Sequence, residues 1–238
     1  MNEKLFRTQF NQMETTEKQA LMESLAARYD MTFLGLHTFD HWGQSCTTGI
    51  FEKDGRKFVF VPGDTVTLGW EQFAVGLNQE SREELEYLFR EWEMEPQNPE
   101  EMIRESMAPV RQAAIGPMLV GRELEELCWE SVKMDDPRLT AHPDWLKEFR
   151  DFAWSDSSSL TLHQSARIER TEKGFQIWIY NRTDYDALLA MLQKQGFSLP
   201  TADEWAYLCG GGCRTLFPWG DGLDYSMRLR WFEAMDED

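Results

Sequence analysis

The spacing of apolar residues near the start of the chain predicts a helix. Apolar side chains recur there at intervals of three or four positions, which places them on one helical face. They are Ala20, Leu21, Leu25, Ala26 and Tyr29. Thr16, followed by Gln19, fits a capping box at the start of this helix. We expect a helical N-terminal extension that packs on the domain behind it.

Extended structure is predicted for the next part of the chain. Residues 31–37 are expected to form a strand, and residues 50–61 a β-hairpin, because the Lys-Asp-Gly at 53–55 is a turn signal between two runs of aromatic and β-branched residues. The Pro-Gly-Asp at 62–64 predicts a second turn before a further short strand.

Residues 76–154 are predicted to form an acidic insertion that is mainly helical. Ser81 with Glu84 fits a second capping box, and Pro143 suits the first turn of another amphipathic helix. The runs of glutamate in this insertion alternate with leucine and aromatic residues at helical spacing. We therefore expect these carboxylates to form solvated faces and to have no acid-base role.

Paired strands are predicted at residues 160–169 and 175–180, and a helix from Thr183 to its stop at Gly196. Together these elements predict an α+β fold. Residues 1–48 are expected to be an N-terminal extension of helix and strand. Residues 49–238 are expected to form the main domain, which contains the acidic insertion.

The net charge of the chain limits the classes of molecule that it is expected to bind. The chain of 238 residues has 24 basic and 42 acidic side chains, which gives a net charge of −18 and a sequence pI near 4.6. A field of this sign repels nucleic-acid phosphates and anionic lipid headgroups, so we expect no nucleic-acid partner and no membrane partner. A protein partner is compatible with the composition, and a basic one is favoured by the charge.

The cellular compartment of the protein is predicted from the first residues of the chain and from its cysteines. The first residues contain no apolar signal region, and no charge-free stretch much exceeds about ten residues, whereas a membrane helix needs roughly 20. We expect a cytoplasmic protein. Its four cysteines are then expected to be thiols and not a disulfide framework.

The most informative segment begins at Pro200. Thr201 is placed to cap a helix with Glu204 at its third position, and Trp205 at the fourth position is expected to fold back over Pro200 as a buried hydrophobic staple. Three glycines at 210–212 end this helix and permit a tight reversal. The Phe-Pro-Trp-Gly that follows predicts an aromatic turn, and its motif residues are Pro218, Trp219 and Gly220.

This segment resembles the signature of the formylglycine-generating enzyme family, also called sulfatase-modifying factors. The residues that match it in order are Leu199, Pro200, Thr201, Glu204, Trp205, Tyr207, Gly211, Gly212, Pro218, Trp219, Gly220 and Asp221. Residues 58–69 are similar to the strand-turn-strand with which the family domain begins. The resemblance implies an irregular fold, rich in Trp and Gly and related to C-type lectins.

The resemblance brings no catalytic or cofactor-binding residue to this sequence. In the family, a copper-binding cysteine pair follows the signature, beyond a Gly-Asn-Val-Trp-Glu-Trp motif, and neither occurs before Asp238. Ser198 replaces the usual arginine, and Ala202 and Ala206 replace usual glutamates. The sequence requires no cofactor; copper, iron, zinc or calcium would follow only from analogy with the family.

Two pairs of residues have the chemistry of metal ligands. Cys209 and Cys213 are soft thiolate ligands at a spacing of four, although the glycines between them disfavour a continuous helix. His37 and His41 have the spacing that places two imidazoles on one helical face, but their surroundings predict strand and loop. Plain thiols and hydrogen-bonded histidines are the competing interpretation of both pairs.

Three functions remain open from the sequence. The first is a cytosolic binding or interaction module on a sulfatase-modifying-factor-like scaffold, without formylglycine-generating activity in this chain. The second is a metal-dependent oxidase of the formylglycine-generating type whose catalytic C-terminal part lies outside this chain. The third is an acidic immunity or inhibitor protein that binds a basic partner.

Overall fold

The computed structural model describes residues 3–41, 43–73, 76–93, 98–124, 126–217 and 220–222. The chain forms two compact units. Unit 1 consists of Met1–Glu123 and Pro200–Asp238, and unit 2 of Leu124–Leu199. Helices and antiparallel sheets occur in both units, so the predicted α+β class is confirmed.

Unit 1 begins with three helices, of which the last and longest is the predicted one. They are η1 (Glu3–Leu5), α1 (Arg7–Gln12) and α2 (Thr15–Tyr29). The predicted cap of α2 is wrong, because the residue before the helix is Glu14, and its N–H donates to the carboxylate of Glu17 at 3.3 Å. Both capping pairs have the same three-residue spacing, so the sequence did not distinguish between them.

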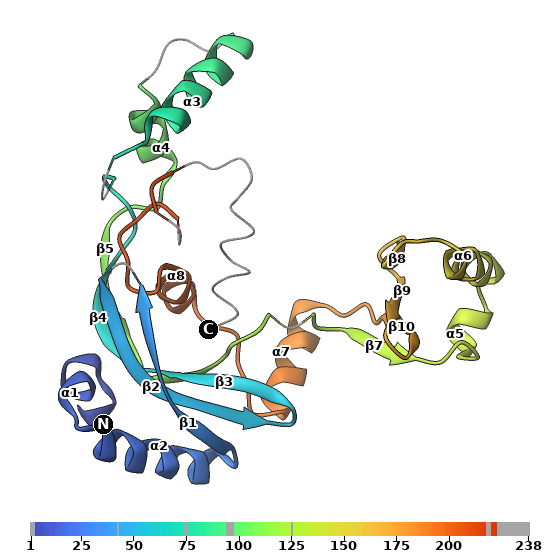
Figure 1. Ribbon diagram of the computed structural model, residues 1–238, viewed down its shortest axis with the longest axis horizontal. Coiled ribbons are helices and arrows are strands. Elements are labelled where there is room, and N and C mark those ends of the chain that lie inside the picture. The colour runs from blue at the N-terminus through green and yellow to red at the C-terminus, as the bar shows by residue number, and fades with distance from the viewer. Residues whose placement is uncertain are drawn as a thin grey trace. The chain divides into compact units, whose positions relative to one another are not determined.

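A four-stranded antiparallel sheet receives α2 on one face (Figure 1). Its strands, in spatial order, are β1 (Thr32–His41), β2 (Gln44–Lys53), β3 (Arg56–Val61) and β6 (Met118–Gly121). The predicted hairpin is confirmed, with Lys53 paired to Arg56 across two residues of positive φ, Asp54 at 52° and Gly55 at 77°. Such a turn matches the twist of paired strands.

The helical extension is built into unit 1. Phe10 of α1 and Met22 of α2 are completely buried, and the Phe10 ring lies 5.3 Å from that of Phe60 on β3. The N–H of Arg7 donates to the carbonyl of Gly63 at 2.8 Å. Extension and sheet therefore share a core, and the boundary predicted after residue 48 falls inside β2.

A second, two-stranded sheet of unit 1 pairs β4 (Asp64–Leu68) with β5 (Arg111–Ile115). Helix α8 (Ala202–Gly210) contacts both strands. Tyr207 of α8 is buried in one cluster with Leu68, Ala113 and Ile115. This contact brings the family-like segment back onto a sheet that is formed much earlier in the chain.

Helices α3 (Gln79–Glu91) and α4 (Pro99–Ser106) pack together, and they lie above β4 and β5 in Figure 1. The cap of α3 is Asn78 and not Ser81, because the Asn78 side chain accepts from the Ser81 N–H at 2.8 Å, and Ser81 itself is completely buried. The predicted insertion is helical only in parts. Three strands interrupt it, β5, β6 and β7 (Trp129–Val132).

Unit 2 is a four-stranded antiparallel sheet with a helix on it. The sheet order is β7, β10 (Gly174–Tyr180), β9 (Ala166–Thr171) and β8 (Ser159–Leu162). Residues 160–169 are two strands and not one, because the chain reverses through positive φ values at His163 and Gln164. The predicted partner strand is confirmed as β10.

The helices of unit 2 are α5 (Pro137–Thr140), α6 (Pro143–Ala153) and α7 (Tyr185–Lys194). Pro143 occupies the first turn of α6, as predicted, and Phe149 and Phe152 bury the inner face of α6 against the sheet core. Asp184, and not Thr183, caps α7 by accepting from the Ala187 N–H at 2.8 Å. Within the described ranges, no helix has the length and apolar character that a membrane span requires.

Gly63 provides a test of the N-terminal packing. A methyl group at Gly63 would lie 2.8 Å from the Phe6 ring and 2.9 Å from the Ile115 carbonyl oxygen, whereas one at Gly116 would meet nothing within 4 Å. We expect Gly63→Ala to lower the free energy of unfolding by about 1–3 kcal/mol through overpacking. Gly116→Ala is the control and is expected to be within about 1 kcal/mol of the wild type. Urea unfolding of both variants checks this, and equal stabilities would contradict it.

Candidate functional site

The family-like helix begins and ends as the sequence predicts. The Thr201 hydroxyl accepts from the Glu204 N–H at 3.2 Å, and the Glu204 carboxylate accepts from the Thr201 N–H at 2.7 Å. Gly211 ends α8 in the left-handed conformation, at φ 56° and ψ 21°. The predicted capping box and glycine stop are confirmed, because both depend only on residues that are close in sequence.

The orientation of α8 corrects the prediction for Trp205. Its side chain is 53% exposed, whereas that of Tyr207 is 3% exposed. Two helical positions differ by about 200° around the axis, so only one of these aromatic rings can face the sheet. Asp203 lies on the inward face with Tyr207, where its carboxylate accepts from Arg111 of β5 at 2.6 and 3.0 Å. The ion pair and the tyrosine together select the inward face, and Trp205 points outward.

The structure describes some of the remaining residues of the family-like motif. Pro200 is exposed immediately before the cap, and Pro218 and Trp219 lie outside the described residues. Gly220 is buried and exchanges two backbone hydrogen bonds with Phe217, at 2.9 and 3.0 Å. The Asp221 carboxylate, 5% exposed, accepts from the Leu216 N–H at 2.9 Å. In this part of the chain the motif therefore closes a turn.

The four cysteines are free thiols. Cys209 is exposed on the last turn of α8, and Cys213 is half-buried beyond the glycine reversal, where its N–H donates to the Gly210 carbonyl at 2.8 Å. Burial raises the pKa of the Cys213 thiol, and the nearby Arg7 cation opposes this shift. This shift favours the thiol over the thiolate, and the thiol is the weaker nucleophile.

A polar cluster that the sequence did not indicate surrounds Arg7. Its Nε lies 3.4 Å from an oxygen of Asp64, and its Nη1 donates to Gln44 at 3.3 Å. Its guanidinium carbon lies 5.8 Å from the ring centroid of Tyr207. Burial raises the pKa of Tyr207 and that of Cys46, and Arg7 opposes both shifts. These residues come from α1, β4, β2 and α8, so no local sequence signal could have joined them.

The histidines lie on a strand and not on a helix. The partly buried His37 ring packs edge-on against Phe39, with ring centroids 4.6 Å apart. His41 is the last residue of β1, and its side chain lies outside the described residues. Four strand positions span about 13 Å, whereas the proposed His-x-x-x-His pairing depends on helical spacing. Among the described residues, no group of three or more His, Cys, Asp or Glu side chains is arranged to hold a metal ion.

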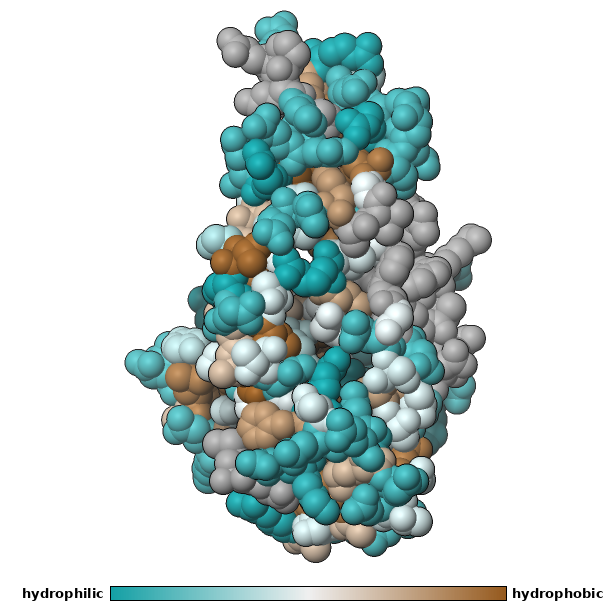
Figure 2. Space-filling model, turned by 90° about the vertical axis from the view of Figure 1, so that its left-hand side faces the viewer, coloured by the Kyte–Doolittle hydropathy of each residue, from teal (hydrophilic) through white to brown (hydrophobic). Residues whose placement is uncertain are grey.

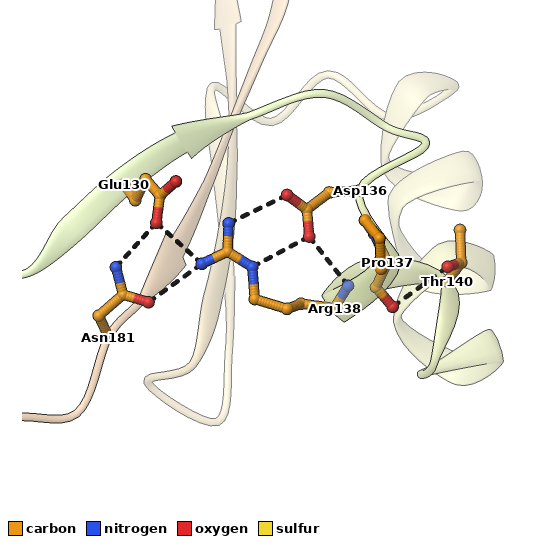
Figure 3. A network of polar contacts seen from close by, with 6 residues as sticks. All are labelled: Glu130, Asp136, Pro137, Arg138, Thr140 and Asn181. Atoms are coloured by element: carbon orange, nitrogen blue, oxygen red, sulfur yellow. Dashed lines mark hydrogen bonds and ion pairs between the residues drawn. The ribbon is translucent and has the colours of Figure 1, made fainter.

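Unit 2 contains an ion-pair network centred on Arg138 (Figure 3). The Arg138 guanidinium donates to Asp136 at 3.0 Å through Nε and through Nη2, and to Glu130 at 2.8 Å. Asn181 also donates to Glu130, at 2.9 Å. The hydrogen bond from Arg138, followed by that from Asn181, lowers the pKa of Glu130 from 4.5 to about 2. The network joins β7, α5 and the end of β10, which is a structural role.

The outer face of α3 combines carboxylates with an exposed aromatic ring. Tyr87 is 53% exposed, and Glu83 and Glu91 lie one helical turn before and after it. Glu80 extends the same face toward the start of the helix. Figure 2 shows hydrophilic residues gathered over the upper part of the molecule, where α3 and α4 lie. We call this set of residues, Glu80, Glu83, Tyr87 and Glu91, the α3 face.

No known protein family, no curated protein and no solved structure matches this chain. The resemblance to formylglycine-generating enzymes therefore remains a prediction that depends on the motif residues themselves.

The two aromatic residues of α8 make a matched pair for mutation. Tyr207→Ala removes a buried ring and is expected to lower the free energy of unfolding by about 3–5 kcal/mol. Trp205→Ala removes an exposed ring and is expected to cost less than about 1 kcal/mol. Urea denaturation of both variants measures the difference. A larger loss from Trp205→Ala would show that α8 packs through its other face.

The low pKa of Glu130 predicts a pH dependence. Since folding lowers this pKa from 4.5 to about 2, the stability that the network contributes is complete above about pH 4.5 and is lost as the pH falls through about 2. Arg138→Gln should return the Glu130 pKa toward 4.5, whereas Arg150→Gln, an exposed residue of α6, should leave it low. Titration of the Glu130 carboxyl by carbon-13 NMR checks this. A wild-type midpoint near 4.5 would refute the network.

Proposed function

We propose that this chain is a cytosolic binding module, on a scaffold related to formylglycine-generating enzymes, for a protein partner that carries exposed Lys or Arg side chains. The α3 face carries this proposal. It places an exposed tyrosine ring between carboxylates one turn away on either side. A Lys or Arg side chain on such a surface meets the ring face by a cation–π contact and a carboxylate by a charge-assisted hydrogen bond.

The packing beneath the α3 face supports a binding role. Leu85 and Phe89 on the inner side of α3 are buried with Ile103 of α4 and with Trp70. Asn78 caps the start of α3, and Arg82 of α3 forms an ion pair with Glu100 of α4. A helix that is fixed in this way loses little backbone conformational entropy on binding, which favours affinity.

Net charge supports the same class of partner. A chain with a net charge of −18 attracts a basic protein over a distance of about 10 Å at 0.1 M salt, which speeds encounter more than it tightens the final complex. Tyrosine and tryptophan are enriched among the residues that contribute most to protein interfaces. Tyr87 would therefore supply the anchor, and the glutamates would provide steering and register.

A labelled deca-lysine peptide tests this proposal by fluorescence anisotropy. We expect binding that weakens as NaCl rises from 50 to 200 mM, since the contacts are partly exposed charge pairs. Tyr87→Ala should weaken binding about two- to fivefold through the lost cation–π contact, and Tyr87→Phe, which keeps the ring, should not. Glu83→Gln with Glu91→Gln should weaken it further.

The control separates the α3 face from bulk charge. Glu148→Gln with Asp151→Asn makes the same change in net charge on the exposed side of α6, in unit 2. This control should change the affinity less than about twofold. Equal losses in the α3 and α6 variants, or binding that does not depend on salt, would overturn the proposal.

A further inference from the structure

Strand β1 forms an edge of the four-stranded sheet of unit 1. It comes first in the sheet order and pairs with β2 alone. Among the described residues, no backbone hydrogen bond outside this pairing involves residues 32–41. β1 is ten residues long, whereas strands typically have about five or six. A strand that is paired on one side presents a row of free N–H and C=O groups, so this long edge can accept a further strand.

Edge strands commonly carry features that prevent such pairing, and most of β1 lacks them. Charged side chains, proline and β-bulges are the common ones. β1 contains neither lysine nor proline, and with histidine neutral Asp40 is its one charged residue, although 28% of the residues in the chain are charged. A β-bulge lies between Phe33 and Gly35, where Leu34 is 49% exposed. From Gly35 to His41 the register with β2 continues without a shift, so this run of the edge has no such protection apart from Asp40.

The unshifted run of β1 can pair with itself across a two-fold axis. Thr38 is its middle residue, because Gly35 and His41 begin and end the run at equal distances from it. When two copies of the run pair antiparallel about an axis at Thr38, side chains on the same face of the sheet come opposite one another. The exposed Thr38 then faces Thr38 of the second copy, which is a favourable pair in antiparallel sheets. Asp40 faces Leu36 and not a second carboxylate.

Local charge favours a second copy of β1 as the strand that pairs with this edge. A basic segment would find one carboxylate along the run, that of Asp40, whereas a second copy brings no like charge directly opposite. The net charge of −18 on each copy opposes association at long range, and salt screens this repulsion. An interface of two strands is also small. We therefore expect a weak dimer that forms more readily at higher salt.

We propose that β1 is an interaction surface for a second copy of this chain, in which the two β1 strands pair antiparallel about Thr38 and join their sheets into one continuous sheet of twice the size. Because each copy has one β1, the interface is isologous and association through it stops at two copies. The α3 face belongs to a different element of unit 1, so either proposal can fail without the other.

Analytical ultracentrifugation of the full chain, from about 5 μM to about 1 mM, tests this proposal. We expect a monomer–dimer equilibrium that is tighter in about 200 mM than in about 50 mM NaCl, the reverse of the salt effect on deca-lysine binding. Thr38→Lys places like charges directly opposite in the dimer and should weaken dimerisation at least about fivefold. Thr32→Lys is the control, because it makes the same change at an exposed position of β1 outside the unshifted run, and it should change dimerisation less than about twofold.

Hydrogen exchange of the wild type gives a second readout that needs no substitution. The peptide that covers Gly35–His41 should take up deuterium more slowly at about 1 mM than at about 5 μM, because the outward N–H groups of β1 bond to the second copy. The β8 edge of unit 2 should show no such change. Three results would each overturn the proposal: a monomer at every concentration, equal dimerisation of the two lysine variants, or β1 protection that is independent of concentration, which would mean that a segment of the same chain covers this edge.

Discussion

The attachment of α8 to the β4–β5 pair is the contact that orients the family-like segment of unit 1. Burial of Tyr207 supplies apolar contact, and the pair of Arg111 and Asp203, 92 residues apart in sequence, fixes which side of the helix faces inward. Since an α-helix is rigid, this one choice turns Trp205 toward solvent and Tyr207 into the core. The residues that make the segment recognisable thus owe their positions to partners outside it.

Sequence reasoning succeeded where structure is decided over a few residues. The Asp54-Gly55 turn, the capping box at Thr201 and the glycine stop at Gly211 involve neighbours in the chain, and all are confirmed. It failed where two nearby residues can each cap a helix. This is the case at the starts of α2 and α3, where the predicted and the observed capping residues lie close together in sequence. It also could not find the cluster around Arg7, because α1 and α8 are brought together only by the folded core.

The candidate sites show the same difference between what neighbouring residues determine and what the fold determines. The cysteine and histidine pairs were proposed from spacing alone, and spacing has meaning only once the type of element is known: His37 lies on a strand, and Cys209 and Cys213 are separated by a left-handed residue. The α3 face, by contrast, could be found from helical periodicity, because its residues belong to one helix.

The division of unit 1 into two stretches of sequence has a consequence for its synthesis. All of unit 2 is translated after β4 and β5 and before α8. At about 5–20 residues per second, the apolar side of that strand pair therefore waits for several seconds before Tyr207 leaves the ribosome. During this interval Leu68 and Ile115 lack the ring that later covers them. A nascent chain of this design has an interval in which a chaperone can bind, or in which two unfinished chains can associate, and α8 brings that interval to an end.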